Sequence, residues 1–253
     1  ISNLPTIERE GYLFLGWYLN GEKVENVPAG LTSAIKLVAM WREPALVVDG
    51  TTSEGHYETL AAALAAVKEG ETIKLVAGEY AGDVTIDVAN IKIVGPNAGL
   101  GALDQRAPEA VINVAKDIAG NLAAKEIIFD GVHLKGTGGG AGIPGVFFQD
   151  GGNIKYLEFK SCVVSDMNTF LKFIETKSNL ELVLQDCYFH TIGQFILWTT
   201  GSINKTLLVG NYVDGSTCGA VTNAAAALFR VRHGYLEAYN NTFNGDSANT
   251  PGY

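Results

Sequence analysis

The sequence predicts an all-β fold in which a small N-terminal module precedes a single-stranded, right-handed parallel β-helix. The main observation is an eight-residue sequence motif, called the repeated phrase below, that occurs at 157–164 and again at 182–189. Its pattern is apolar, x, apolar, x, turn-forming residue, Cys, x, apolar. Looser copies occur at 127–134, 208–213 and 238–243. The residues that follow the turn position step by 30, 25, 24 and 30 positions: Val132, Cys162, Cys187, Asn211 and Asn241. Such a period with strand alternation is typical of a solenoid whose coils bury their apolar sides by stacking.

Composition fits this fold and excludes some functions. A chain of 253 residues suits one large domain or one plus a small module, and 47% hydrophobic residues suffice for a core. Only 18% of residues are charged, as expected when flat stacked strands form the surface. The net charge of −9, without a Lys/Arg cluster, argues against a nucleic-acid partner. No apolar run reaches the roughly 18 residues of a membrane span.

Two of the three cysteines, Cys162 and Cys187, occupy the same column of neighbouring coils. A strand spacing of about 4.8 Å would permit a disulfide. Parallel stacking, however, points both side chains the same way rather than at each other. We therefore expect two free, buried thiols. In the same column, Asn211 and Asn241 are expected to form a short amide ladder.

Residues 1–43 differ from the rest of the chain. Alternation at 12–18 and 35–41 indicates two strands, with a tight Asn20-Gly21 turn between them. We expect Trp17 and Trp41 to pack in the small core of this module.

This segment resembles the Listeria–Bacteroides repeat, the internalin B-repeat type, a β-grasp-like module of bacterial surface proteins. The matching residues are Pro5, Arg9, Glu10, Gly11, Tyr12, Phe14, Gly16, Trp17, Tyr18, Ala39 and Trp41. The resemblance implies an extracellular or cell-surface location. The first strand usual in such repeats is absent, so the chain is expected to be part of a longer surface protein.

The second domain, 44–253, begins with a predicted strand at 45–48 and a helix at 59–70. In that helix Thr59 is the expected N-cap, Gly70 the expected end, and Leu60, Leu64 and Val67 share one face. Strands are predicted at 72–80, 84–86, 87–95, 111–114 and 124–134, with loops at 96–108, 136–142 and 214–226. A second strand of each coil is predicted at 145–149, 170–175, 194–199 and 227–232.

The helix and the strand after it resemble the N-terminal cap of the pectin-lyase-like superfamily. In that superfamily an aromatic-x-Thr-Ile helix covers the open end of the solenoid, before an Ala-Gly-x-Tyr strand. Here the corresponding residues are Tyr57, Thr59 and Leu60, followed by Ala77, Gly78 and Tyr80. The resemblance implies the fold and a capping helix, but not an activity.

The sequence offers no catalytic or metal-binding set. The paired aspartates and arginine of pectin methylesterases are not reproduced, although 226–231 faintly resembles one of their strands. The polygalacturonase motifs are missing too. Asp130, Lys160 and Gln185 are expected to form a surface ladder rather than a calcium site. The histidines, at 56, 133, 190 and 233, show no metal-ligand spacing, and solvated or capping roles are expected. We expect no metal and no cofactor.

One outward face has the chemistry of a ligand site. Counting back from inward positions places Phe148, Phe173 and Leu197 in the core, and their neighbours outside. The predicted outward residues are Phe147, Gln149, Lys172, Ile174, Ile196 and Trp198, with Arg230 and Arg232 continuing the sheet. An aromatic platform beside cations suits a polysaccharide that carries uronate or sulfate groups. The alternative is that loops 136–145 and 214–226 cover these side chains as an outer mini-core.

The function predicted from these observations is a non-catalytic, cell-surface or secreted adhesion or glycan-binding module. The alternative is a polysaccharide-active lyase or esterase with an unrecognised site. An enzyme should show two carboxylates, or a cation and a carboxylate, on adjacent coils.

Overall fold

The protein divides into two compact units, 1–45 and 46–253. The computed structural model describes residues 4–7, 9, 12–27, 34–42, 45–114, 118–120, 126–136, 146–150, 154–173, 177–216, 229–232 and 234–245. No helix in this described part is both long and apolar enough to cross a membrane.

The N-terminal unit contains a three-stranded antiparallel sheet. Its strands are β1 (Leu13–Leu19), β2 (Glu22–Val24) and β3 (Val38–Arg42), in the order β2-β1-β3. Asn20 and Gly21 both have positive φ, 53° and 90°, as a tight hairpin turn requires. The turn joins β1 to β2, so the expected direct connection to the strand near 35–41 was wrong. Phe14 packs on Trp17 and Trp41, with ring centroids 5.8 and 5.1 Å apart.

The second unit is built from one short helix and many strands. Its elements are β4 (Ala45–Val48), β5 (His56–Tyr57), α1 (Leu60–Ala66), β6 (Thr72–Leu75), β7 (Gly78–Ala81), β8 (Ile91–Val94), β9 (Ala110–Val114), β10 (Ile118–Gly120), β11 (Glu126–Asp130), β12 (His133–Gly136), β13 (Val146–Asp150), β14 (Tyr156–Lys160), β15 (Val163–Phe173), β16 (Lys177–Gln185), β17 (Tyr188–Val209), β18 (Tyr212–Asp214), β19 (Phe229–Arg232), β20 (Tyr235–Tyr239) and β21 (Thr242–Asn244).

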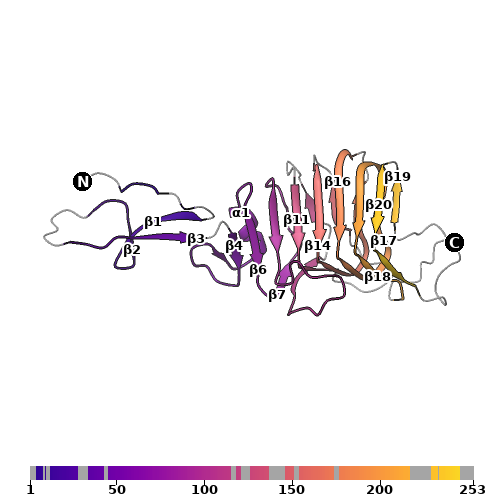
Figure 1. The fold of residues 1–253 in the computed structure, drawn as a ribbon, viewed down its shortest axis with the longest axis horizontal. Coiled ribbons are helices and arrows are strands. Elements are labelled where there is room, and N and C mark those ends of the chain that lie inside the picture. The colour runs from indigo at the N-terminus through magenta and orange to yellow at the C-terminus, as the bar shows by residue number, and fades with distance from the viewer. Residues whose placement is uncertain are drawn as a thin grey trace. The chain divides into compact units, whose positions relative to one another are not determined.

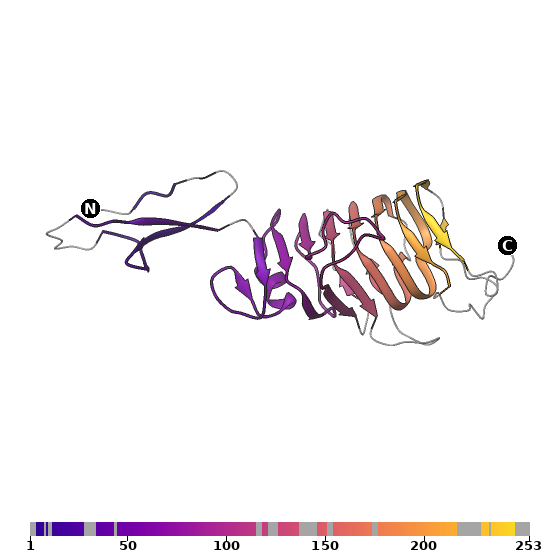
Figure 2. The ribbon, with the colours of Figure 1, turned by 60° about the horizontal axis from the view of Figure 1, so that its bottom comes forward.

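These strands pair in parallel along three ladders. Ladder one runs through β6, β8, β11, β14, β16, the end of β17 and β20. Ladder two runs through β7, β9, β12, the starts of β15 and β17, β18 and β21. Ladder three runs through β10, β13, the end of β15, the middle of β17 and β19. From β8 to β19 each coil adds one strand to each ladder, whereas the β6–β7 coil has no strand in ladder three. The unit is a parallel β-helix with strands stacked side by side (Figures 1 and 2).

A sharp corner between ladders one and two explains the repeated phrase. The residue at the corner has a positive φ in successive coils: Gly131, Ser161, Asp186, Gly210 and Asn240. At Gly131 an added Cβ would lie 2.0 Å from the backbone nitrogen of Ala98, so only glycine fits there. Asp and Asn tolerate this left-handed conformation better than most residues. The left-handed residue turns the chain, so the apolar positions on both sides of it face the core.

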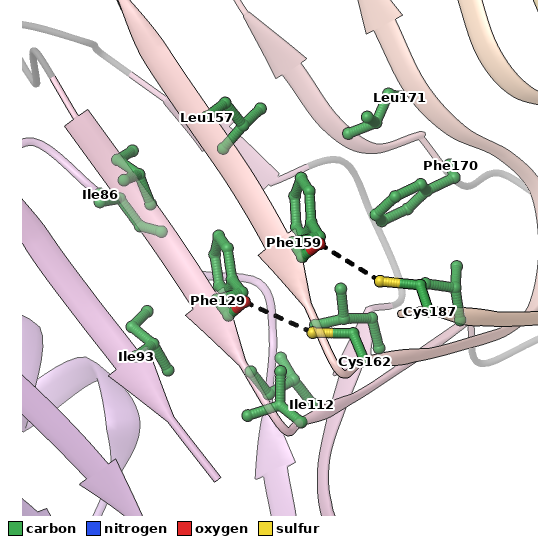
Figure 3. Close-up of a cluster of buried hydrophobic side chains, with 14 of the residues drawn as sticks. Ile86, Ile93, Ile112, Phe129, Leu157, Phe159, Cys162, Phe170, Leu171 and Cys187 are labelled. Carbon is green, nitrogen blue, oxygen red and sulfur yellow. Dashed lines mark hydrogen bonds between the residues drawn. The ribbon is translucent and has the colours of Figure 1, made fainter. Parts of the chain in front are cut away.

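The core is a stack of aromatic and aliphatic side chains, which Figure 3 shows around the cysteine column. Phe129 and Phe159 stack with parallel rings 5.0 Å apart. Cys162 and Cys187 are free and buried, as predicted. Their thiols donate to the carbonyls of the preceding coil, Cys162 to Phe129 at 3.6 Å and Cys187 to Phe159 at 3.3 Å (Figure 3).

The expected amide ladder is also present. Asn211 Nδ2 donates to Asn241 Oδ1 at 2.9 Å and to the carbonyl of Leu184 at 2.7 Å. Asn241 Nδ2 donates in the same way to the carbonyl of Leu208, at 2.8 Å. The cysteine thiols and the asparagine amides therefore have the same role in successive coils, because each donates a hydrogen bond to a backbone carbonyl of the preceding coil.

Helix α1 is shorter than predicted. Thr59 is its N-cap, with the hydroxyl accepting from the Ala62 amide at 3.1 Å. The C-cap is Val67 rather than Gly70, because Val67 adopts an extended conformation with ψ 144°. Leu60, Ala63 and Leu64 enter the core cluster. Residues 84–86 do not form the expected strand, although Ile86 is buried in the core.

Candidate functional site

The third ladder aligns four of the predicted site residues in one row. Gln149 pairs with Lys172, Lys172 with Trp198, and Trp198 with Arg230. Neighbouring members of a parallel row are about 4.8 Å apart along the β-helix. We call Lys172, Trp198 and Arg230 the cation–aromatic row.

Lys172 and Trp198 contact each other directly. The Lys172 ammonium lies 4.7 Å from the centroid of the indole ring, which is a cation–π contact. Both side chains are partly buried, as is Arg230. The hydroxyl of Thr199 donates to the carbonyl of Arg230 at 3.2 Å and ties β17 to β19 beside the row. The row therefore has an aromatic ring with a cation in register on each side.

Trp198 is more enclosed than an isolated platform would be. Phe195, which is 6% exposed, stacks on it with ring centroids 5.4 Å apart and planes at 28°. The indole Nε1 is buried, and no acceptor in the described part of the chain reaches it. A buried donor without a partner costs free energy, so a group that accepts from Nε1 would be stabilising there.

The predicted face needs two corrections. Ile196 was expected outside but lies in the core, with no exposed surface. Phe195 packs on Trp198, whereas Ile196 and Leu197 both belong to the core, just after a shift in the register of β15 and β17. The count of 11 residues used for the prediction also places Ile174 beside Trp198. In the structure Phe148 pairs with Leu171 rather than Phe173, so Lys172 lies beside Trp198 instead.

The other predicted site residues are less fully described. Arg232 pairs with Ser202, beyond a register shift that follows Trp198. The side chains of Phe147, Gln149 and Arg232 lie outside the described residues, as does Ile174 altogether. The predicted covering loops 136–145 and 214–226 are described only at residues 136 and 214–216.

A polar network on ladder two was not predicted. His133 Nε2 lies 2.8 Å from Ser165 Oγ, and that hydroxyl donates to Asp166 Oδ2 at 2.8 Å. Burial lowers the pKa of His133 to about 4, so the imidazole is neutral near pH 7. His133 is therefore not the solvated histidine that the sequence suggested. In the ladder His133 is in register with Val163 and Ser165 with Lys135, so the contact is diagonal and alignment of the two segments does not reveal it.

This network does not form a nucleophilic centre as it stands. Ser165 has no exposed surface, and its proton is directed to Asp166 rather than to the histidine. Asp166 has a φ of 57°, so the hydrogen bond holds a strained bend in β15. We assign the network a structural role.

Ladder one carries a second group of charged side chains. The hydroxyl of Tyr156 donates to Glu158 at 3.1 Å. Burial, together with nearby Glu158, raises the pKa of Tyr156. Two coils away, Lys205 Nζ lies 3.9 Å from Glu181 and 3.4 Å from Glu237. These side chains, Tyr156, Glu158, Glu181, Lys205 and Glu237, are called the carboxylate face.

The carboxylate face was not predicted. Tyr156, Glu181 and Lys205 share one column of ladder one, just before the repeated phrase, and Glu158 and Glu237 share another. The predicted stack of Asp130, Lys160 and Gln185 does occur in register beside it. Burial raises the pKa of Asp130, whose Oδ1 accepts from the Gly99 amide at 3.2 Å. Among the described residues, no group of three or more His, Cys, Asp or Glu side chains is arranged to hold a metal ion.

Comparison with known proteins gives one solved structure. No family model matches the chain, and no curated protein matches it. The structure of the pectin methylesterase from Aspergillus niger is similar, with a TM-score of 0.44 and 14% sequence identity. The match covers 81% of this chain and 87% of the esterase chain. A likeness of this size does not decide function, which has to be inferred from the side chains.

Proposed function

We propose that the β-helix binds an anionic polysaccharide at the cation–aromatic row, as a non-catalytic adhesion or glycan-binding module. The observation that carries the proposal is the Lys172 ammonium 4.7 Å above the Trp198 ring, with Arg230 in register on the other side. Sugar rings present C–H faces that pack on indole, and carboxylate or sulfate groups pair with ammonium and guanidinium. The three side chains together select a polymer with both features.

The geometry of the ladder suits a linear polymer. Lys172 and Arg230 are separated by two strand spacings, about 10 Å, with the indole between them. A polysaccharide lying along the β-helix axis meets cation, ring and cation in turn. The chain as a whole carries a net charge of −9, so an anionic polymer is repelled elsewhere and the row determines where it docks.

Other features support a cell-surface setting for this activity. The resemblance of residues 1–43 to the Listeria–Bacteroides repeat favours a β-grasp-like spacer in a longer bacterial surface protein. We take the pectin-lyase-like resemblance to mean a right-handed coil whose first turn is capped by α1, since its buried side chains belong to the core. The β-helix would then be a stiff scaffold that displays the row.

Binding to an array of neutral, uronate-containing and sulfated glycans tests the proposal. We expect anionic glycans to bind with an affinity that falls as salt is added. Trp198→Ala should lower the affinity at least about tenfold, and Lys172→Gln should weaken binding and reduce its salt dependence. Lys92→Gln, an exposed lysine on ladder one, is the matched control and should bind like the wild type.

The outer mini-core hypothesis predicts a different outcome for the same variant. If Trp198 only packs, Trp198→Ala should cost about 3 kcal/mol of unfolding free energy, as buried aromatic truncations do. It should also leave glycan binding unchanged. An array without any hit, or a hit that binds Trp198→Ala as tightly as the wild type, would refute the binding site.

A polysaccharide lyase or esterase is the second candidate, favoured by the carboxylate face. Lys205 lies between Glu181 and Glu237 of the adjacent coils, which is the cation–carboxylate arrangement expected of an enzyme. The similar solved structure is named as a pectin methylesterase, which agrees with this candidate better than with the non-catalytic one. Incubation of any bound glycan with the protein, followed by assays for chain cleavage and released methanol, separates the two. Turnover that disappears in Lys205→Gln would establish the enzyme.

A further inference from the structure

The outward side of ladder two carries aromatic side chains on adjacent coils. Phe189 and Val213 belong to the core cluster, so the residues on either side of them in the same strands point away from it. These residues are Tyr188, His190, Tyr212 and Asp214 (β17 and β18 in Figure 1). Tyr188 is in register with Tyr212, and His190 with Asp214. We call these four residues the tyrosine–aspartate patch.

The rings of the tyrosine–aspartate patch lie close together and are partly exposed. The ring centroids of Tyr188 and Tyr212 are 5.7 Å apart, and those of Tyr188 and His190 are 5.0 Å apart. All four members of the patch have intermediate exposure. Aromatic rings that follow one another at the spacing of neighbouring strands offer a surface on which the C–H faces of linked sugar rings can pack.

Two carboxylates make the patch negative. Asp214 Oδ1 accepts from the amide and the hydroxyl of Ser216, at 3.2 and 2.6 Å, which holds this side chain at the end of β18. Asp166 follows Ser165, the residue in register with His190 in the preceding coil. Burial lowers the pKa of His190, and the nearby carboxylates of Asp166 and Asp214 oppose this shift only in part. The imidazole is therefore neutral near pH 7, and it does not offset the two carboxylates.

Little positive charge lies near the patch on the same ladder. Among the charged residues in the strands of ladder two, Lys135 is the one base, and the acids are Glu79, Asp166 and Asp214. Lys135 lies two coils from His190 in the same column, about 10 Å away. Arg106, which precedes β9, is paired with Glu109. The charges around the patch therefore favour a cationic ligand.

We propose that the tyrosine–aspartate patch binds a glycan that carries protonated amino groups. The sugar rings pack on Tyr188 and Tyr212, and the ammonium groups pair with the carboxylates of Asp214 and Asp166. A cation is also attracted to the faces of the tyrosine rings. An uncharged sugar would use only the rings, and a lysine-rich peptide would use only the charges. The site lies on a different ladder from the cation–aromatic row and selects the opposite charge, so it does not rest on the function proposed for that row.

Calorimetric titration with short glucosamine oligomers tests the proposal, in slightly acidic buffer that protonates their amines. The fully N-acetylated oligomer is the matched ligand, because it keeps the length and the rings but has no charge. We expect the free-amine oligomer to bind at least about tenfold more tightly than the acetylated one. Its affinity should fall as salt is added, since the contact depends on charge.

Variants of the patch locate the binding. Asp214→Asn keeps the oxygen that accepts from Ser216 but removes the charge, so it should lower the affinity at least about tenfold and reduce the salt dependence. Tyr212→Ala should also weaken binding, whereas Tyr212→Phe keeps the ring and should bind nearly as well as the wild type. Asp87→Asn makes the same chemical change at an exposed residue between β7 and β8, and this control should bind like the wild type.

The proposal would be overturned if the free-amine oligomer did not bind, or if the acetylated oligomer bound equally well. Unchanged affinity in Asp214→Asn would place the binding on another acidic surface. A lysine oligomer that bound as tightly as the glucosamine oligomer would show that the patch recognises charge without the sugar. Asp214→Asn is close in size to the wild type, so it decides the outcome even if thermal melts show that Tyr212→Ala does not fold.

Discussion

Asn211 is the most informative position at which to test the corner ladder. Its side chain is 4% exposed and makes three hydrogen bonds. Oδ1 accepts from the Cys187 amide at 3.0 Å, and Nδ2 donates to the Leu184 carbonyl at 2.7 Å and to Asn241 Oδ1 at 2.9 Å. Asn211→Ala leaves the Cys187 amide and the Leu184 carbonyl without these partners inside the core. At about 1–3 kcal/mol for each unsatisfied buried group, we expect a loss of about 3 kcal/mol of unfolding free energy.

Two further variants separate the hydrogen bonds from general packing. Asn241→Ala removes the same chemistry from a partly exposed position of the same column, where water can replace the amide. We expect it to cost about 1 kcal/mol. Asn211→Cys should fall between the two, because a thiol can donate to the Leu184 carbonyl as Cys162 and Cys187 donate in their coils. It cannot accept from the Cys187 amide as the carboxamide oxygen does.

Urea unfolding followed by far-UV circular dichroism measures these differences, with the slope of the transition as a check that the unfolded state is unchanged. The reasoning would be refuted if Asn211→Ala cost less than about 1 kcal/mol, or no more than Asn241→Ala. Either result would mean that the ladder accompanies the coil without stabilising it.

Two other predictions concern the buried thiols and the buried histidine. Cys162 and Cys187 should resist thiol reagents in the folded protein, because burial raises the pKa of Cys187 and both residues are fully covered. Titration of the unfolded, unreduced chain should count three thiols. A count of one would show that a disulfide joins two of the cysteines. His133 should make the protein less stable in acid. The pKa of its imidazole is about 4 in the folded protein and 6.5 in the reference state. As the pH falls from 6.5 to 4, the unfolded chain therefore binds a proton that the folded chain does not, and the free energy of unfolding decreases. The loss should reach about 3 kcal/mol and then level off, and it should be absent in His133→Gln; an equal pH dependence in both proteins would contradict the assignment.

The sequence by itself determined the coil. The repeated phrase predicted the parallel ladders, the corner and the cysteine–asparagine column, because stacked coils impose the same local geometry on equivalent positions and similar residues recur there every 24 to 30 positions. The free thiols and the amide ladder followed from the same register. Thr59 was correctly predicted as the N-cap, since capping depends on contacts within one turn of the helix.

Only the tertiary structure decided which side chains are neighbours on the outer faces of the β-helix. Lys172 rather than Ile174 neighbours Trp198, because Leu171 lies 13 residues before Leu184 of ladder one, whereas Phe148 and Leu197 each lie 11 residues before their ladder-one counterparts. Ile196 is buried where the register of β15 and β17 shifts. The His133–Ser165 pair and the carboxylate face were not predicted, since residues about 30 positions apart meet only through the pairing of strands. Local patterns specify each strand and turn, whereas the outer faces depend on coil lengths that the loops set. The site chemistry lies on those faces, so it became visible only when the coils were stacked.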